Sequence, residues 1–250
     1  MASHLRHGPD GQMRLRIIEH NLRLLANSAL ENKDEEKLPR GGELEQQKQR
    51  GKPLKAILLF SIDTQSTQSE IQTMINTWRK QMADNHDAHN LAYNIISQII
   101  YVPNNPTMVD ASKWIVAIDK LLPEIQAFNA RVMLINDSFV LTRNVPELWS
   151  DNCGDVCGLV WTASKDDPTR HIQSYIRTLS SCAVERYKRF YWERSTKIHN
   201  VHELIVQFEM NLDWIGRGEK DGGVNAIYEF AGAHPDADKA QKVSLLVVCE

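Results

Sequence analysis

The sequence contains no long apolar run and few cysteines. Its longest uninterrupted apolar stretches, "AILLF" and "LLVV", are far shorter than the roughly 20 residues of a membrane-spanning helix, and the N-terminal residues lack a signal peptide's continuous apolar core. The 4 cysteines are too few for a disulfide scaffold, and the C-x3-C pair Cys153 and Cys157 has no second pair with which to bind zinc. We therefore expect reduced thiols and a cytoplasmic protein without a transmembrane segment, while peripheral membrane contact stays open.

Motifs of several large enzyme classes are also missing. No G-x-G-x-x-G follows a strand-like run and no G-x-x-x-x-G-K-[ST] occurs, which argues against dinucleotide enzymes and P-loop NTPases. The G-x-S-x-G of α/β-hydrolases is absent as well. A net charge of −3 argues against a nucleic-acid partner held by bulk charge.

Segments of strand and helix character alternate along the chain, of which 42% is hydrophobic. Strand-like runs cover residues 54–63, 97–104, 131–138, 158–164 and 243–250. Helical spacing is found over residues 69–85, 109–127 and 201–215, and over 170–191 as a helix or a helix with a strand-like insert. Pro123 is expected to break or kink the helix that contains it. The alternation predicts an α/β fold with a mainly parallel sheet flanked by helices.

The composition divides the chain into an N-terminal part, residues 1–52, and a body, residues 53–250. Residues 1–12 have no periodic apolar face, so we expect them to be flexible and dispensable for folding. Apolar residues at spacings of three and four predict a helix over 14–30, packed on the body or, alternatively, lying on a membrane surface. Residues 31–52 are densely charged and contain no aromatic residue, which is typical of a linker.

Two of the strand-like runs end in a carboxylate. Asp63 follows "LKAILLFSI", and Asp137 follows "RVMLIN". In an open α/β sheet, ligands bind at the carboxyl ends of the strands, where a carboxylate can hold a divalent cation or a ribose hydroxyl. Each Asp could equally be a turn residue or a helix cap. Two such ends favour a site and leave the reaction open.

The stretch "VMLINDSFVLTRNVPELW" resembles sugar-nucleotide-dependent glycosyltransferases of the GT-A type, in which an apolar strand ends in an acidic motif. More specifically, "LINDSF", "DVCGLVWTAS" and "RHIQSYI" resemble, in order and spacing, the rhamnan synthesis protein F family over about residues 55–195. The resemblance implies a GT-A-like nucleotide-sugar transferase fold. It also implies transfer of a sugar, rhamnose or another deoxysugar among the candidates, from a nucleotide diphosphate donor to a glycan acceptor.

The resemblance and the positions of polar residues together give candidate roles. Asp137 would hold a divalent cation, Mn²⁺ or Mg²⁺, at the leaving diphosphate. The expected substrate-binding residues are Asp63, Asn136, Ser138, Trp161 and Gln173. The expected catalytic residues are Asp166, Asp167 and His171. Of these, the two aspartates are candidates for the base that deprotonates the acceptor hydroxyl.

Structural roles remain open for some of these residues. Asp166 and Asp167 could belong to a solvated turn, and Trp161 to the core. His171 and Gln173 would share a face only if their segment is extended, and they could otherwise be a capping and a surface residue. Two other functions also remain open, a non-catalytic carbohydrate-binding or scaffold module and a nucleotide-sugar hydrolase.

Overall fold

A computed structural model of the 250-residue chain describes residues 2–3, 9–35, 54–62, 65–84, 95–150, 153–162, 170–216 and 223–228. The strands are β1 (Ala2–Ser3), β2 (Ala56–Ile62), β3 (Ile96–Pro103), β4 (Val132–Ile135), β5 (Val156–Val160), β6 (Ile176–Leu179) and β7 (Val224–Tyr228). The α-helices are α1 (Pro9–Glu35), α2 (Gln65–Asp84), α4 (Val109–Ala127), α5 (Ser181–Ser195) and α6 (Val201–Glu203). Shorter or irregular helical segments are η2 (Pro146–Trp149), η4 (Leu204–Phe208) and η5 (Glu209–Gly216). The fold is therefore mixed α/β, as the sequence predicted.

The strands form two sheets rather than one. The first is parallel and has the order β1-β2-β3, and the second has the order β4-β6-β5-β7. In the second sheet β6 runs antiparallel to both β4 and β5, whereas β5 and β7 are parallel. The direction of β6 agrees with the antiparallel bridge between Trp161, directly after β5, and Ile172, a few residues before β6. A parallel partner would have required a crossover through a helix.

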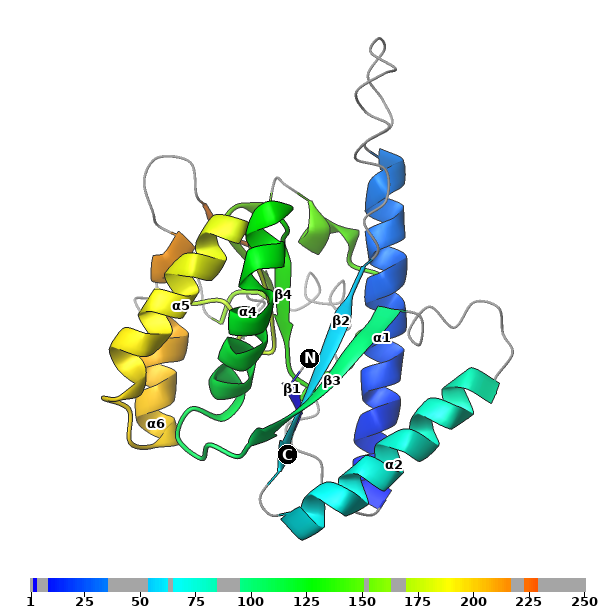
Figure 1. Cartoon of the computed structure of the whole chain (residues 1–250). Helices are drawn as coiled ribbons and strands as arrows, with labels where there is room; N and C mark the ends of the chain where they lie inside the picture. The colour runs from blue at the N-terminus through cyan, green and yellow to red at the C-terminus, as the bar shows by residue number, and fades with distance from the viewer. Residues whose placement is uncertain are drawn as a thin grey trace, which may run out of the picture.

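Helix α4 covers one face of both sheets. Alternate residues of β2 and β4, such as Leu59 and Leu134, belong to one hydrophobic core with Trp114, Ile115 and other residues of α4. Helix α5 and the segments η4 and η5 extend this layer over the second sheet. Figure 1 shows α4 and α5 on the same side of the strands. One continuous core therefore connects the two sheets.

Helices α1 and α2 cover the opposite face of the first sheet. Leu58 and Phe60 of β2 pack there against Leu15 and Ile18 of α1 and Ile71 of α2. Further along α1, Leu25 belongs to a third cluster, which lies under the second sheet together with η2. The molecule thus has three layers, and Figure 1 shows α1 beside β2 on the side away from α4. Helix α1 contributes residues to the clusters of both sheets.

Hydrogen bonds hold α1 to the segment that follows β4. Asn21 is fully buried, and its Nδ2 donates to the Phe139 carbonyl at 2.8 Å while its Oδ1 accepts from the Leu141 N–H at 2.8 Å. Two helical turns after Asn21, Ser28 Oγ accepts from the Val145 N–H at 2.7 Å. These bonds satisfy buried backbone groups that belong to no strand or helix. The predicted packing of this helix on the body is confirmed.

The carboxyl ends of the strands lie at one edge of the molecule. Ile62 at the end of β2 pairs with Pro103 at the end of β3, and α4 begins a few residues later. Trp114, in the second turn of α4, donates from Nε1 to the carbonyl of Ile135, the last residue of β4, at 3.3 Å. The ends of β2, β3 and β4 therefore lie on the same side, although β2 and β4 belong to different sheets.

Several local predictions need correction. Residues 1–12 are not uniformly unstructured, because Ala2 and Ser3 pair with Leu59 and Phe60, and α1 begins at Pro9. Helix α4 continues past Pro123 to Ala127. Pro123 is exposed, so the carbonyl that it leaves without an N–H partner can reach water. Residues 36–52 and the predicted strand 243–250 lie outside the described residues.

The state of the two buried cysteines near the start of β5 also differs from the predicted reduced thiols. Cys153 and Cys157 form a disulfide, with their Cα atoms 5.5 Å apart, a usual separation for such a bond. The prediction of reduced thiols is therefore wrong, and the redox argument for a cytoplasmic location no longer holds. Within the described residues, no helix is long and apolar enough to cross a membrane.

The role of Asn21 gives a first prediction. Asn21→Leu leaves the Phe139 carbonyl and the Leu141 N–H buried without this partner, and we expect it to lower the free energy of unfolding by about 2–4 kcal/mol. Arg23→Ala, an exposed position on the same helix, is the control and should change stability by less than about 0.5 kcal/mol. Urea unfolding measures both. Equal stability of Asn21→Leu and the parent would contradict the assigned role of α1.

Candidate functional site

Residues Asn136 to Ser138 form a tight polar turn directly after β4. The Asn136 side-chain Oδ1 accepts from the Ser138 N–H at 3.1 Å and from Ser138 Oγ at 2.5 Å, which is an Asx-turn. The Asn136 N–H donates to the Tyr175 carbonyl at 3.1 Å, on the segment that leads into β6. The turn is therefore held by the bonds between Asn136 and Ser138 and by the bond to the segment that leads into β6.

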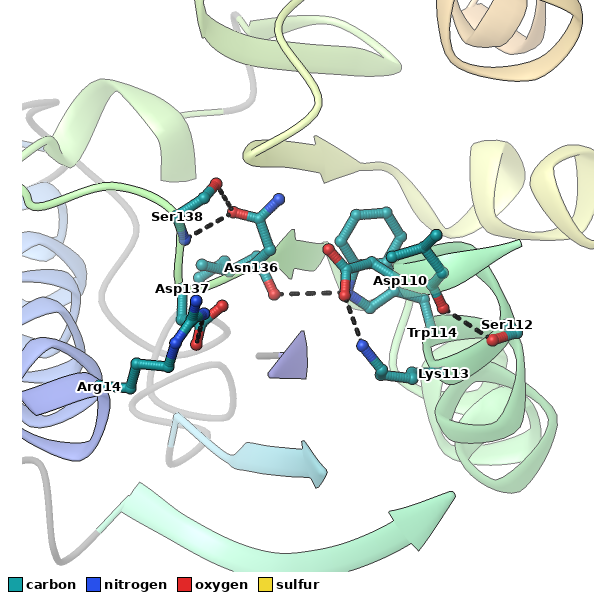
Figure 2. Close-up of polar contacts among 10 residues, drawn as sticks. Arg14, Asp110, Ser112, Lys113, Trp114, Asn136, Asp137 and Ser138 are labelled. Carbon is teal, nitrogen blue, oxygen red and sulfur yellow. Dashed lines mark hydrogen bonds and ion pairs between the residues drawn. The ribbon is translucent and has the colours of Figure 1, made fainter. Parts of the chain in front are cut away.

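Asp137 points the other way, towards α1. Its side chain is 7% exposed and its Oδ2 accepts from Arg14 Nη1 at 2.9 Å, as Figure 2 shows. The Arg14 side chain is 38% exposed, so the guanidinium lies between the buried carboxylate and solvent. A guanidinium has five N–H donors, and it can hold a carboxylate and an anionic ligand together.

A second ion pair lies opposite this turn, at the start of α4. Lys113 is almost fully buried and its Nζ lies 2.7 Å from Asp110 Oδ1. Figure 2 shows Asp110 and Trp114 directed towards the end of β4, next to Asn136. Val109, the first residue of α4, has φ of 38°, a strained value for a β-branched residue. Strained residues gather at functional sites, so this helix start belongs to the candidate site.

No feature of the local sequence singles out Asp110 and Lys113. Their spacing predicts an i, i+3 ion pair on any helix, and such pairs are usually exposed and contribute little. The burial of Lys113 depends on where α4 packs, and so it could not be read from the local pattern.

The candidate residues of the next strand connection lie in an extended segment. The Gln173 N–H donates to the Val160 carbonyl at 3.2 Å and Ile172 is fully buried, so His171 and Gln173 lie on the other face of the segment. His171 Nδ1 is 3.1 Å from Thr162 Oγ1, which fixes the orientation of the imidazole. The segment is therefore extended, and this is the condition under which the sequence predicted that His171 and Gln173 share a face.

Trp161 is partly buried at the end of β5. The guanidinium of Arg170 lies over its ring, 4.0 Å from the centroid. One face of the indole is thus already covered by a cation. A sugar that stacks on Trp161 would use the other face or displace Arg170.

The strand registers bring these predicted residues to one edge. Strands β4 and β5 both run antiparallel to β6, so the turn at 136–138 and the segment at 161–162 leave the sheet on the same side. Residues 170–175 lead into β6 from that side. Asp63, Asp166 and Asp167 lie outside the described residues.

The described residues do not by themselves make a cation site at Asp137. No group of three or more His, Cys, Asp or Glu side chains comes together within the described ranges. Asp137 is bonded to a guanidinium, and the side-chain oxygen of Asn136 is engaged by Ser138. A divalent cation prefers several oxygen ligands, so it would have to replace Arg14 and recruit others.

Comparison with known proteins adds no family to this description. No protein-family model matches the sequence, and no curated protein matches it. The similarity to the rhamnan synthesis protein F family stays a prediction.

The Arg14–Asp137 pair gives a second prediction. Arg14→Gln removes the charge that faces a buried carboxylate, and we expect a loss of about 1–2 kcal/mol in the free energy of unfolding. The control is Arg143→Gln, which breaks the exposed pair with Glu147 at 3.1 Å and should cost less than about 0.5 kcal/mol. Chemical denaturation measures both variants, and the double-mutant cycle of Arg14→Gln, Asp137→Asn and their combination gives the interaction energy of the pair. Equal losses from Arg14→Gln and Arg143→Gln would show that burial of Asp137 is unimportant.

Proposed function

We propose that this protein transfers a sugar from a nucleotide diphosphate donor to a glycan acceptor, with the donor diphosphate at the Asn136–Ser138 turn. One observation carries the proposal. The turn, Trp161 and the segment containing His171 and Gln173 are three separate parts of the sequence, and the strand registers place them at one edge of the second sheet. Ligands of α/β folds bind at such edges.

Positive charge from Arg14 and from the N-terminus of α4 would stabilise a leaving group that becomes more negative. When the bond between sugar and diphosphate breaks, positive charge develops on the sugar ring and negative charge on the diphosphate. Arg14 can bond a phosphate oxygen while its other donors hold Asp137. The start of α4 adds the partial positive charge of a helix N-terminus on the opposite side. Preorganised charges of this kind stabilise the transition state most when water is excluded.

The acceptor hydroxyl needs a base. Asp166, Asp167 and His171 are proposed for this role, and the ring orientation that Thr162 gives to His171 supports including it. Gln173 and Trp161 are proposed to bind the sugar, Asp63 the nucleoside, and Asn136 and Ser138 the leaving group. The two alternatives, a scaffold module and a nucleotide-sugar hydrolase, are distinguished by the experiments below.

Asp137→Asn tests the catalytic role of the turn. The substitution is nearly isosteric but removes the charge that orders Arg14, and we expect transfer to fall by about 10²–10³-fold while the fold is kept. Glu147→Gln removes an Arg-paired carboxylate of the same kind at an exposed position and is the matched control. Rates are measured with a panel of nucleotide sugars and glycan acceptors. Transfer by Asp137→Asn within a few-fold of the parent would make Asp137 a structural residue only.

Nucleotide binding is tested separately by thermal unfolding. A nucleoside diphosphate at about 100 times its Kd stabilises the native state by about 2.7 kcal/mol, which corresponds to a rise of roughly 5–10 °C in Tm for a domain of this size. We expect this rise with at least one of UDP, GDP and dTDP, and we expect Arg14→Gln to reduce it.

The same titration with Mn²⁺ or Mg²⁺ tests the predicted cation. An additional rise that Asp137→Asn abolishes would support a cation at Asp137, and an unchanged Tm would contradict it. A protein that no nucleotide stabilises is better described as a scaffold. Release of free sugar at the full rate without acceptor would instead assign a hydrolase.

A further inference from the structure

An apolar cavity of about 480 Å³ lies between the two sheets. Its walls are the first half of β2, the whole of β4 and one face of α4, and Leu22 and Leu25 of α1 contribute to it. The cavity is partly open to solvent. Concave sites of this size with mostly apolar walls are typical of binding sites for small molecules. The cavity is therefore a candidate binding site distinct from the turn at Asn136–Ser138.

The cavity exists because β2 and β4 do not pair with each other. Within the described residues, β2 pairs on the side away from β3 with β1 at Leu59 and Phe60, and β4 pairs with β6. The space beside residues 54–57 and 132–135 is bridged by α4 on one side. The shape of the cavity is thus set by the fold and not by one badly packed side chain.

The cavity is elongated and is called the slot below. It follows α4 from Trp114 to Phe128, which at 1.5 Å per residue is about 21 Å. This length matches an extended hydrocarbon chain.

The two ends of the slot differ in polarity. The inner end lies at Ile135 and Trp114 and is apolar. The outer end contains Lys55, Glu124 and Arg131, and Lys55 Nζ is 2.6 Å from Glu124 Oε1. The Arg131 guanidinium donates from Nη2 to the Gly154 carbonyl at 2.9 Å, so it is held by the second sheet. Two cations and one carboxylate leave a net positive charge at this end. Phe128, half exposed, lies at this outer end.

We propose that the slot binds a single-chain fatty acid. The hydrocarbon chain would lie along α4 with its methyl end at Ile135, and the carboxylate would lie at Lys55 and Arg131. This assignment follows from the length, the apolar lining and the net positive charge of the outer end. It does not depend on the proposed sugar transfer.

A chain-length series is the direct test. Binding of octanoate, decanoate, dodecanoate and tetradecanoate to the full chain is measured by calorimetry, below the concentration at which each forms micelles. Burial of each methylene contributes about 0.8 kcal/mol, which corresponds to about a fourfold gain in affinity per methylene. We expect this gain to continue until the slot is filled and then to stop. Undetectable binding, or affinity independent of chain length, would overturn the proposal.

Matched variants locate the binding. Ala117 lines the slot, and Ala117→Phe should reduce dodecanoate affinity at least tenfold by filling it. Val116→Phe, at the exposed neighbouring position, should bind as the parent does. If Ala117→Phe does not fold, Ala117→Leu is the smaller substitution for the same test. Equal affinity of the folded Ala117 variant and the parent would show that the fatty acid binds elsewhere.

The head group is tested with an uncharged ligand. Lys55→Gln should weaken dodecanoate several-fold and leave dodecanol unaffected, whereas Lys120→Gln, an exposed position on α4, should change neither. If Lys55→Gln weakens both ligands equally or neither of them, the carboxylate does not lie at the outer end and the proposed class of ligand is wrong.

Discussion

Helix α4 is the element on which the rest of the structure depends. It connects the carboxyl end of β3 to the start of β4, and it packs over both sheets within one core. The bond from Trp114 to the carbonyl of Ile135 brings the end of β4 to the same side as the end of β3. Helix α4 packs on both β2 and β4, which do not pair with each other. The position of the Asn136–Ser138 turn is therefore a consequence of how α4 packs.

Helix α1 imposes the second constraint, on the far side of the turn. Asn21 fixes the backbone at Phe139 and Leu141, and Arg14 binds Asp137 directly. The turn is thus held by the core through α4 and by polar bonds through α1. This explains why Asp137 can be buried as a carboxylate, since its charge is balanced before any ligand arrives. A site of this kind favours an anion that binds Arg14 alongside Asp137. A cation that binds Asp137 would have to compete with Arg14.

The sequence was most informative where local pattern and tertiary structure agree. The helix predicted over 109–127 and the apolar run 132–135 coincide with α4 and β4, because their apolar faces are the ones that pack. The polar turn after β4 was found for the same reason. Asp110 and Lys113 were missed because their burial depends on contacts distant in sequence. The pairing of Ala2 and Ser3 with β2 was missed because two residues carry no periodic signal.

The slot and the candidate site meet at the same two residues. Ile135 and Trp114 form the inner end of the slot, and the bond between them immediately precedes Asn136. Both residues are almost fully buried, so the support of the turn is complete in the structure as it stands. Trp114 and Ile135 therefore contribute both to the wall of the slot and to the position of the polar turn at the end of β4.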